Sequence, residues 1–323
     1  MKTLVFVLLG LPVFAVIIVQ LLALKRDREA AANYPPMGQM VDVDGVQVHA
    51  VQMGQGPDLV LLHGASGSTR DFTFAFADLL KDRYRITMLD RPGLGWSEQI
   101  DPAHRRAWSS AHASPRDQAR LLRAASDRLG VKNPIVLGHS FGGIVGYAWA
   151  LEFDDLVGFV SVAGVANPWP GDLGWTYAVN GSAWGGALVA PVLSAFVPEA
   201  YVETTLASIF EPQSAPEGYL DYVGAALPLR RNSMRANARQ VNWLRPYVVE
   251  MSENYGQVKV PVEIVHGDAD TIVPLAVHSA RIPGQIAGAN LTVLPGVGHM
   301  PQHTNPDDVI AAIDRVATRA GLR

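Results

Sequence analysis

The chain contains no cysteine and has few charged residues for its length of 323. The missing thiols exclude a disulfide scaffold, a cysteine-ligated zinc or iron–sulfur centre and a thiol nucleophile. Charged residues make up 17% of the chain and hydrophobic ones 49%, which excludes a disordered or low-complexity protein and provides for a sizeable core. The net charge of −4 leaves no basic surface for nucleic acid, so we expect no nucleic-acid partner.

Two common ligand-binding motifs are also missing. The sequence has no H-E-x-x-H, which would place two histidines on a zinc ion, and no G-x-x-x-x-G-K, which would hold a nucleotide phosphate. We therefore expect neither a metal nor a cofactor, and a small molecule as the ligand.

Residues 4–24 form one apolar run without a charge, LVFVLLGLPVFAVIIVQLLAL. As a helix this run would be about 31 Å long, which is enough to cross the hydrocarbon core of a bilayer. It is longer than the apolar core of a secretory signal, and the A-x-A-like site at 30–32 lies behind a charged stretch. The run predicts a single-pass membrane anchor at 4–24, with a cleaved signal peptide or a buried core helix as the alternatives.

The charges around this run bear on its orientation. Three basic residues follow it, at 25, 26 and 28, and only Lys2 and the amino terminus precede it. This count of basic residues favours, by a small margin, a cytoplasmic position for the rest of the chain. An extracytoplasmic position is the alternative. Residues 25–39 are expected to be a linker.

Short apolar runs alternate with helical patterns along residues 40–323. The expected strands are a hairpin at 40–54 and single strands at 58–65, 84–91, 133–140, 156–164, 260–268 and 289–296; the expected helices are 71–82, 114–130, 141–153 and 305–321. This alternation predicts an α/β fold, a mostly parallel doubly wound sheet. Residues 167–255 contain no convincing buried strand and predict a helical cap, inserted before an acid-bearing strand and placed over the ligand-binding edge of the sheet.

A G-x-S-x-G sequence runs from Gly138 to Gly142, between an expected strand and an expected helix. A nucleophile elbow has this arrangement, because the serine sits in a sharp turn where residues two before and two after must lack side chains. The following helix directs its N-terminus at the serine and favours negative charge there. This context predicts that Ser140 is a nucleophile.

A serine nucleophile needs a base, and the base needs an orienting acid. His299 lies in the loop after the last expected strand and is the predicted base, with His303 as its rival. Asp270 follows the strand at 260–268 and is the predicted acid, while Asp268 is expected to shape the turn.

The other histidines are expected to have structural roles. Three are expected to support the backbone near the site: His63, His139 and His266. Four are expected to be exposed: His49, His104, His112 and His278.

An oxyanion hole needs two backbone N–H donors, each of which contributes about 3 kcal/mol to transition-state stabilisation. One is expected from Phe141, directly after the nucleophile. The other is expected from Ala65, in the loop after the first buried strand.

Together these segments resemble the α/β-hydrolase fold family, in its serine-nucleophile, cap-bearing form. The segments are HGASGS (63–68), DRPGLGWS (90–97), GHSFGG (138–143), HGDADTIVP (266–274) and GVGHMPQH (296–303). The resemblance covers residues 40–323 and implies catalytic Ser140, Asp270 and His299. The DRPGLGWS segment is expected to shape a loop beside the pocket.

The triad predicts a serine hydrolase that cleaves a carboxylic ester through an acyl-enzyme. The aromatic residues of the 167–255 segment and the apolar N-terminus motivate the hypothesis that this ester is apolar. Carbon–carbon hydrolases, thioesterases, lactonases and cofactor-free haloperoxidases use the same triad and are the alternatives. A membrane-tethered binding scaffold is the non-enzymatic alternative.

Overall fold

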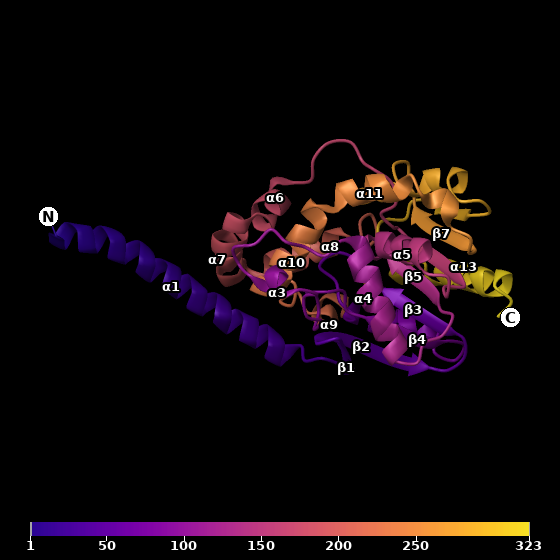
Figure 1. Ribbon diagram of the computed structural model, residues 1–323, viewed down its shortest axis with the longest axis horizontal. Coiled ribbons are helices and arrows are strands. Elements are labelled where there is room, and N and C mark those ends of the chain that lie inside the picture. Colours follow the sequence, from indigo (N-terminus) through magenta and orange to yellow (C-terminus); the bar gives the residue numbers. More distant parts are fainter. Residues whose placement is uncertain (1, 323) are drawn as a thin grey trace.

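The computed structural model describes residues 2–322, and it describes only the backbone of residues 2–10 and Glu199. Figure 1 shows a long N-terminal helix, α1 (Lys2–Asn33), which runs along one side of an α/β body and continues beyond it.

One eight-stranded sheet forms the centre of the body. Its strands are β1 (Gln39–Val43), β2 (Val46–Gly54), β3 (Asp58–Leu62), β4 (Arg85–Leu89), β5 (Ile135–His139), β6 (Gly158–Val162), β7 (Val262–Gly267) and β8 (Asn290–Leu294). Their order is β1-β2-β4-β3-β5-β6-β7-β8, and only the β1–β2 and β2–β4 pairs are antiparallel. The predicted mostly parallel α/β sheet is confirmed.

The hairpin between β1 and β2 follows from its two turn residues. Asp44 and Gly45 have φ of 51° and 88°, values that aspartate tolerates and glycine adopts freely. Val43 therefore pairs directly with Val46.

Helices cover both faces of the sheet. The alternation along β3 shows the division: Val60 and Leu62 join the core beneath α4 (Pro115–Arg128) and α5 (Phe141–Glu152), whereas Leu59 and Leu61 join the core beneath α13 (Pro306–Arg319). The helix α4 begins with a capping box in which Ser114 and Asp117 each bond to the other's backbone N–H.

The single helix expected at 71–82 is instead two short pieces, α2 (Arg70–Thr73) and η1 (Phe76–Leu79). The chain leaves helical geometry at Ala75, with φ of −155°. This break lets Phe72 and Phe76 both reach the core, with ring centroids 6.3 Å apart.

The segment between β6 and β7 is helical. It contains α6 (Trp175–Gly181), η2 (Gly185–Val189), α7 (Ala190–Phe196), α8 (Glu199–Ser208), α9 (Tyr219–Val223), α10 (Arg231–Asn242), α11 (Leu244–Ser252) and η3 (Tyr255–Gln257). We refer to this segment as the cap. Three further short elements lie outside it: α3 (Pro102–Arg105), η4 (Ser279–Gly284) and α12 (Pro301–Thr304).

The linker expected at 25–39 is shorter in the structure, because α1 continues to Asn33. Alanine-rich sequence favours this continuation, and two contacts with the cap hold it. Arg26 donates to the carbonyl of Val197 at 2.6 Å, and Asp27 pairs with Arg231 at 2.7 Å. The connection to β1 is therefore only residues 34–38.

Within the part of the chain whose side chains are described, no single helix combines the length and the hydropathy that a membrane span needs. Two consecutive helical segments, Gly185–Phe196 and Ala200–Ser208, reach the required length and hydropathy only when they are taken together, and the chain bends by 101° between them. Residues 4–10 of the predicted anchor lie outside the residues described in this way.

Candidate active site

Ser140 occupies the sharp turn between β5 and α5. Its φ of 53° and ψ of −117° form a strained conformation that the surrounding backbone enforces. A Cβ on Gly138 would lie 2.2 Å from the carbonyl oxygen of Gly142, and one on Gly142 would lie 2.1 Å from that of Leu62. The two glycines of the motif are therefore required for the turn to close.

The three predicted triad residues lie in one hydrogen-bonded chain. His299 Nε2 is 2.9 Å from Ser140 Oγ, and His299 Nδ1 is 2.7 Å from Asp270 Oδ2. All three side chains are buried. The carboxylate can only accept, so His299 carries its proton on Nδ1 and presents Nε2 as the acceptor for the serine hydroxyl.

Asp270 is held ionised by its neighbours. Burial raises the pKa of its carboxyl, but the hydrogen bonds from His266 and His299 outweigh burial and hold the pKa well below its usual range. Its other oxygen accepts the N–H groups of Ile272 and Val273 at 2.8 and 2.9 Å. Four contacts, from β7, the His299 loop and the acid's own turn, thus fix the orienting acid.

The neighbouring candidates have other partners. His303, the rival base, is 2.8 Å from Asp71 and does not contact Ser140. Asp268 accepts the N–H of Gly296 at 2.6 Å, which ties the acid's turn to the loop that carries His299.

Two of the histidines expected to be exposed are buried. His49 Nδ1 bonds to Asp90 at 2.7 Å, and its Nε2 accepts the N–H of Gly38. His278 accepts the N–H of Asn167 at 3.2 Å. Both histidines serve as hydrogen-bond partners for groups distant in the sequence, which a local sequence pattern does not show.

The loop that follows β3 lies directly against the nucleophile. A Cβ on Gly64 would be 3.0 Å from Ser140 Cβ. Ala65, the next residue, lines the same cavity as Ser140. Ala65 therefore lies beside Ser140 in space and Phe141 follows it in the chain, and their assignment as oxyanion donors stays a prediction.

Arg91 orients this loop, and it belongs to the DRPGLGWS segment that is expected to shape a loop beside the pocket. Its guanidinium donates to the carbonyls of His63 and Gly64 at 3.0 and 3.1 Å, and it lies over the Phe141 ring at 4.1 Å from the centroid. Burial lowers its pKa to about 9, so it stays charged at neutral pH. The Gly64 carbonyl and the Ala65 N–H belong to one trans peptide, so with that carbonyl on Arg91 the N–H points away from the guanidinium.

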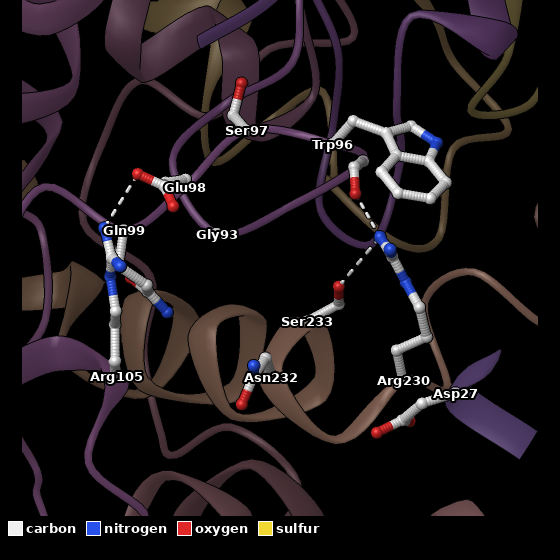
Figure 2. A pocket seen from close by; sticks show the side chains of 11 residues that line it. Asp27, Gly93, Trp96, Ser97, Glu98, Gln99, Arg105, Arg230, Asn232 and Ser233 are labelled. Atoms are coloured by element: carbon white, nitrogen blue, oxygen red, sulfur yellow. Dashed lines mark hydrogen bonds and ion pairs between the residues drawn. The ribbon is translucent and has the colours of Figure 1, made fainter. Parts of the chain in front are cut away.

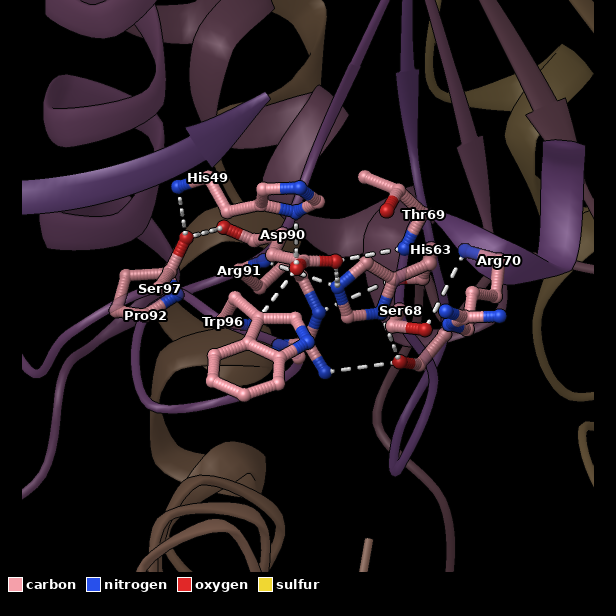
Figure 3. A network of polar contacts seen from close by, with 12 residues as sticks. His49, His63, Ser68, Thr69, Arg70, Asp90, Arg91, Pro92, Trp96 and Ser97 are labelled. Atoms are coloured by element: carbon pink, nitrogen blue, oxygen red, sulfur yellow. Dashed lines mark hydrogen bonds and ion pairs between the residues drawn. The ribbon is translucent and has the colours of Figure 1, made fainter. Parts of the chain in front are cut away.

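Asp90 organises the same region, as Figure 3 shows. Its carboxylate accepts from His49 and from the backbone N–H groups of Thr69 and Trp96, at 2.6–2.8 Å. Burial raises the pKa of Asp90, but the bond from His49 outweighs it and the net shift is downward. Asp90 and Arg91 are the first two residues of the DRPGLGWS segment. Their contacts agree with the expectation that this segment shapes a loop beside the pocket.

The sequence and the fold of this chain are similar to those of known proteins. Residues 59–312 match the model of the family described as the alpha/beta hydrolase family. The chain belongs to this family. Its match covers most of the sheet and the whole cap.

Three similar proteins illustrate the range of the family. The dihydrolipoyllysine-residue acetyltransferase component of an acetoin cleaving system from Cupriavidus necator is 29% identical, over 90% of this chain and 70% of that protein. A 2-hydroxy-6-oxo-6-phenylhexa-2,4-dienoate hydrolase from Comamonas testosteroni is 22% identical, over 83% of this chain and 90% of that protein. A solved alpha/beta hydrolase fold protein from Burkholderia ambifaria has a TM-score of 0.67 and 26% identity, over 86% of this chain and 97% of that one.

In this alpha/beta hydrolase, Ser140 lines a cavity of about 230 Å³ between the core and the cap. On the side formed by the cap, six apolar side chains line this cavity: Tyr177, Leu206, Ile209, Val223, Leu227 and Pro228. A small, apolar molecule fits a cavity of this kind.

One buried carboxylate also reaches this cavity. Asp71 accepts from the Tyr219 hydroxyl of the cap at 2.7 Å and from His303 of the core at 2.8 Å. Burial raises its pKa, but the charge of His303 outweighs burial and the net shift is strongly downward. Asp71 therefore joins the cap to the helix that follows the predicted base.

Gln213 makes a second connection between the cap and the His299 loop. Its amide donates to the carbonyl of Gly296 at 2.7 Å and accepts the N–H of Gly298 at 2.9 Å. The contact is close, because a Cβ on Gly298 would lie 2.0 Å from the carbonyl oxygen of Glu211. The loop that carries the predicted base is thus partly held by the cap.

A second cavity, of about 320 Å³, lies beside the first (Figure 2). Gly95 and Ser233 line both cavities. Arg230 hydrogen-bonds to the carbonyl of Gly95 and to Ser233, and it lies 4.8 Å from the centroid of the Trp96 ring. This arginine therefore lines the second cavity and contacts both residues that the two cavities share.

Three buried histidines are expected to make the fold sensitive to mild acid. Burial lowers the pKa of His63, His139 and His278 to about 4, from an ordinary value of 6.5. The unfolded chain binds protons between pH 6.5 and 4 that the folded chain does not. Their contribution to stability is complete above pH 6.5 and decreases toward pH 4, by up to about 1.4 kcal/mol per pH unit for each histidine.

Urea unfolding of the detergent-solubilised chain at pH 7 and pH 5 measures this effect. We expect a clearly lower midpoint at pH 5. His278→Gln, which retains an acceptor for the N–H of Asn167, should reduce the difference by about a third. Equal midpoints at the two pH values would contradict the prediction.

Proposed function

We propose that this alpha/beta hydrolase cleaves a carboxylic ester through an acyl-enzyme on Ser140. The observation that supports the proposal most directly is the continuous chain from Ser140 Oγ through His299 to Asp270, with contacts of 2.9 and 2.7 Å. A base positioned and oriented in this way is what a serine hydroxyl needs to become a nucleophile.

The proposed reaction has two halves. Ser140 Oγ attacks the ester carbonyl while His299 Nε2 takes its proton, and the N–H groups of Ala65 and Phe141 stabilise the oxyanion. The intermediate collapses when His299 returns the proton to the leaving alcohol. Water then attacks the acyl-enzyme, again with His299 as the base, and releases the acid and free Ser140.

The substrate we propose is apolar, and the chain is held at a membrane by residues 4–24. The cavity beside Ser140 is walled mainly by aliphatic and aromatic side chains, which favour an acyl or alcohol group without charge. The uncharged run at the N-terminus has the length of a membrane span. The charge count supports a cytoplasmic position for the catalytic body by a small margin.

A carbon–carbon bond hydrolase is the second candidate. The relative from Comamonas testosteroni carries that activity in its name, and it aligns with 83% of this chain. The same serine, base and acid would serve such a reaction, so the triad alone does not separate the two bond types.

The test is hydrolysis of p-nitrophenyl esters from acetate to palmitate by the full chain in detergent. Labelling by a fluorophosphonate, mapped by mass spectrometry, should identify Ser140 as the reactive serine. We expect hydrolysis with an optimum at intermediate or long acyl chains. Labelling without hydrolysis of any ester would overturn the ester proposal in favour of another bond, and the absence of labelling in folded protein would overturn the enzymatic proposal.

A further inference from the structure

The exposed aromatic side chains of this molecule are unevenly distributed. Those that the structure shows as exposed are Phe14, Trp108, Trp175, Trp184, Phe196, Tyr201 and Trp243. Phe14 belongs to α1, five belong to the cap, and Trp108 packs edge-on against Trp184 with ring centroids 4.9 Å apart. The exposed large hydrophobic residues elsewhere on the described body are all aliphatic.

An apolar stripe follows η2 and α7. Trp184, Leu188, Val192 and Phe196 are spaced four residues apart, and each is at least 43% exposed. Four residues make about one helical turn, so the four side chains lie along one side of this helical segment. Trp175, on the preceding helix α6, is 74% exposed. We call these five residues the cap stripe.

This surface lies beside the apolar part of α1. Figure 1 shows α7 beside the second half of α1. Arg26 fixes the pair by donating to the carbonyls of Ser194 and Val197, near the end of α7. The side chains of α1 immediately before this contact are exposed and apolar, among them Leu21 and Leu22. The helix α7, which carries Val192 and Phe196 of the cap stripe, therefore lies against α1 close to the point where the uncharged run ends.

The cap helices place this surface close to the catalytic cavity. On α6, Tyr177 lines the cavity while Trp175, two residues earlier, is exposed. The helix α8 continues the chain directly after α7, and its Leu206 lines the cavity. The helix α6 thus borders both the cavity and the cap stripe, and α8 joins the end of α7 to the cavity wall.

We propose that the cap stripe rests in the interfacial region of a lipid bilayer, next to α1, so that membrane-dissolved substrate enters the cavity through the cap. The inference rests on the proposed anchor at 4–24 and extends it from one helix to a docked catalytic body. Tryptophan is the side chain most suited to the interface, because its ring is apolar and its N–H is polar. A second copy of the chain is the competing occupant, and the continuity with the uncharged run of α1 favours lipid.

The absence of cysteine makes a direct test possible. Single variants Trp184→Cys and Phe196→Cys, carrying an environment-sensitive fluorophore, report on the stripe. Leu79→Cys and Val293→Cys are matched controls, since these residues are 51% and 42% exposed on η1 and β8. Each full chain is placed in phosphatidylcholine nanodiscs with and without lipids that carry a collisional quencher.

We expect blue-shifted emission and at least threefold quenching at positions 184 and 196, and neither at 79 and 293. Unquenched labels at 184 and 196 in disc-bound protein would overturn the proposal. A blue shift that appears in lipid-free detergent and disappears on dilution would also overturn it, in favour of contact between two copies. Failure of the chain to enter the nanodiscs would overturn both the docking proposal and the proposed anchor at 4–24. Fluorophosphonate labelling of the same samples tests the hydrolase proposal independently.

Activity gives a second readout. The double variant Trp184→Ser with Phe196→Ser should hydrolyse a vesicle-dissolved long-chain ester at least tenfold more slowly than the wild type. Its rate with water-soluble p-nitrophenyl acetate should stay unchanged, because neither residue touches the catalytic cavity. An equal loss with both esters would contradict a docking role.

Discussion

Replacing Ser140 with alanine is expected to lower the turnover of an ester substrate by about 10⁶-fold. The substitution removes the single atom that His299 Nε2 contacts at 2.9 Å, so the base has no nucleophile to activate. The oxyanion donors and the cavity remain, and they should retain a small acceleration over water. Initial rates with p-nitrophenyl butyrate measure the loss.

Ser233→Ala is the matched control for this measurement. Ser233 is also a buried serine that lines the catalytic cavity, but its hydroxyl bonds to Arg230 rather than to the triad. Its rate should stay within a few-fold of the wild type. A Ser140→Ala protein that keeps a tenth of the activity would show that another residue is the nucleophile.

Asp270→Asn should lower turnover by about 10⁴-fold without unfolding the chain. The amide oxygen would remain on the N–H groups of Ile272 and Val273, which the carboxylate now binds. The amide NH₂ would then face His299 Nδ1 and donate to it. His299 would then carry its proton on Nε2, the nitrogen that faces Ser140. A protonated Nε2 cannot accept the proton of the serine hydroxyl.

Asp268→Asn separates this tautomer effect from a general loss of turn geometry. Asp268 accepts one N–H, from Gly296, and an asparagine oxygen can replace that contact. We expect a change of less than threefold, measured with the same ester and accompanied by an unchanged thermal midpoint. Similar losses in the two variants would indicate that the loop, and not the tautomer, determines the rate.

The local sequence predicted the parts of the site that depend on local geometry. The glycines around Ser140 are required by a turn of five residues, so those five residues alone are enough to predict the turn. His299 and Asp270 follow strand ends, and parallel strands bring such ends to one edge of the sheet. Both could therefore be assigned from their order in the chain.

The parts that were missed depend on contacts between distant segments. Arg91 acts on a loop 27 residues before it in the sequence, and Asp71 meets partners 148 and 232 residues away. The burial of His49 depends on a bond to Asp90, 41 residues later. Such pairings have no periodicity, so the sequence indicated only that the DRPGLGWS segment had some structural role.

The Gln213 contact implies that the cap is not an exchangeable module. Its amide bonds to the carbonyl of Gly296 and to the N–H of Gly298, the residue directly before the predicted base. A chimaera that receives the cap of a relative without an equivalent amide would carry every catalytic side chain and still misplace the imidazole. Divergence of substrate range in this lineage is therefore expected to proceed by single substitutions within the cap rather than by recombination of whole caps.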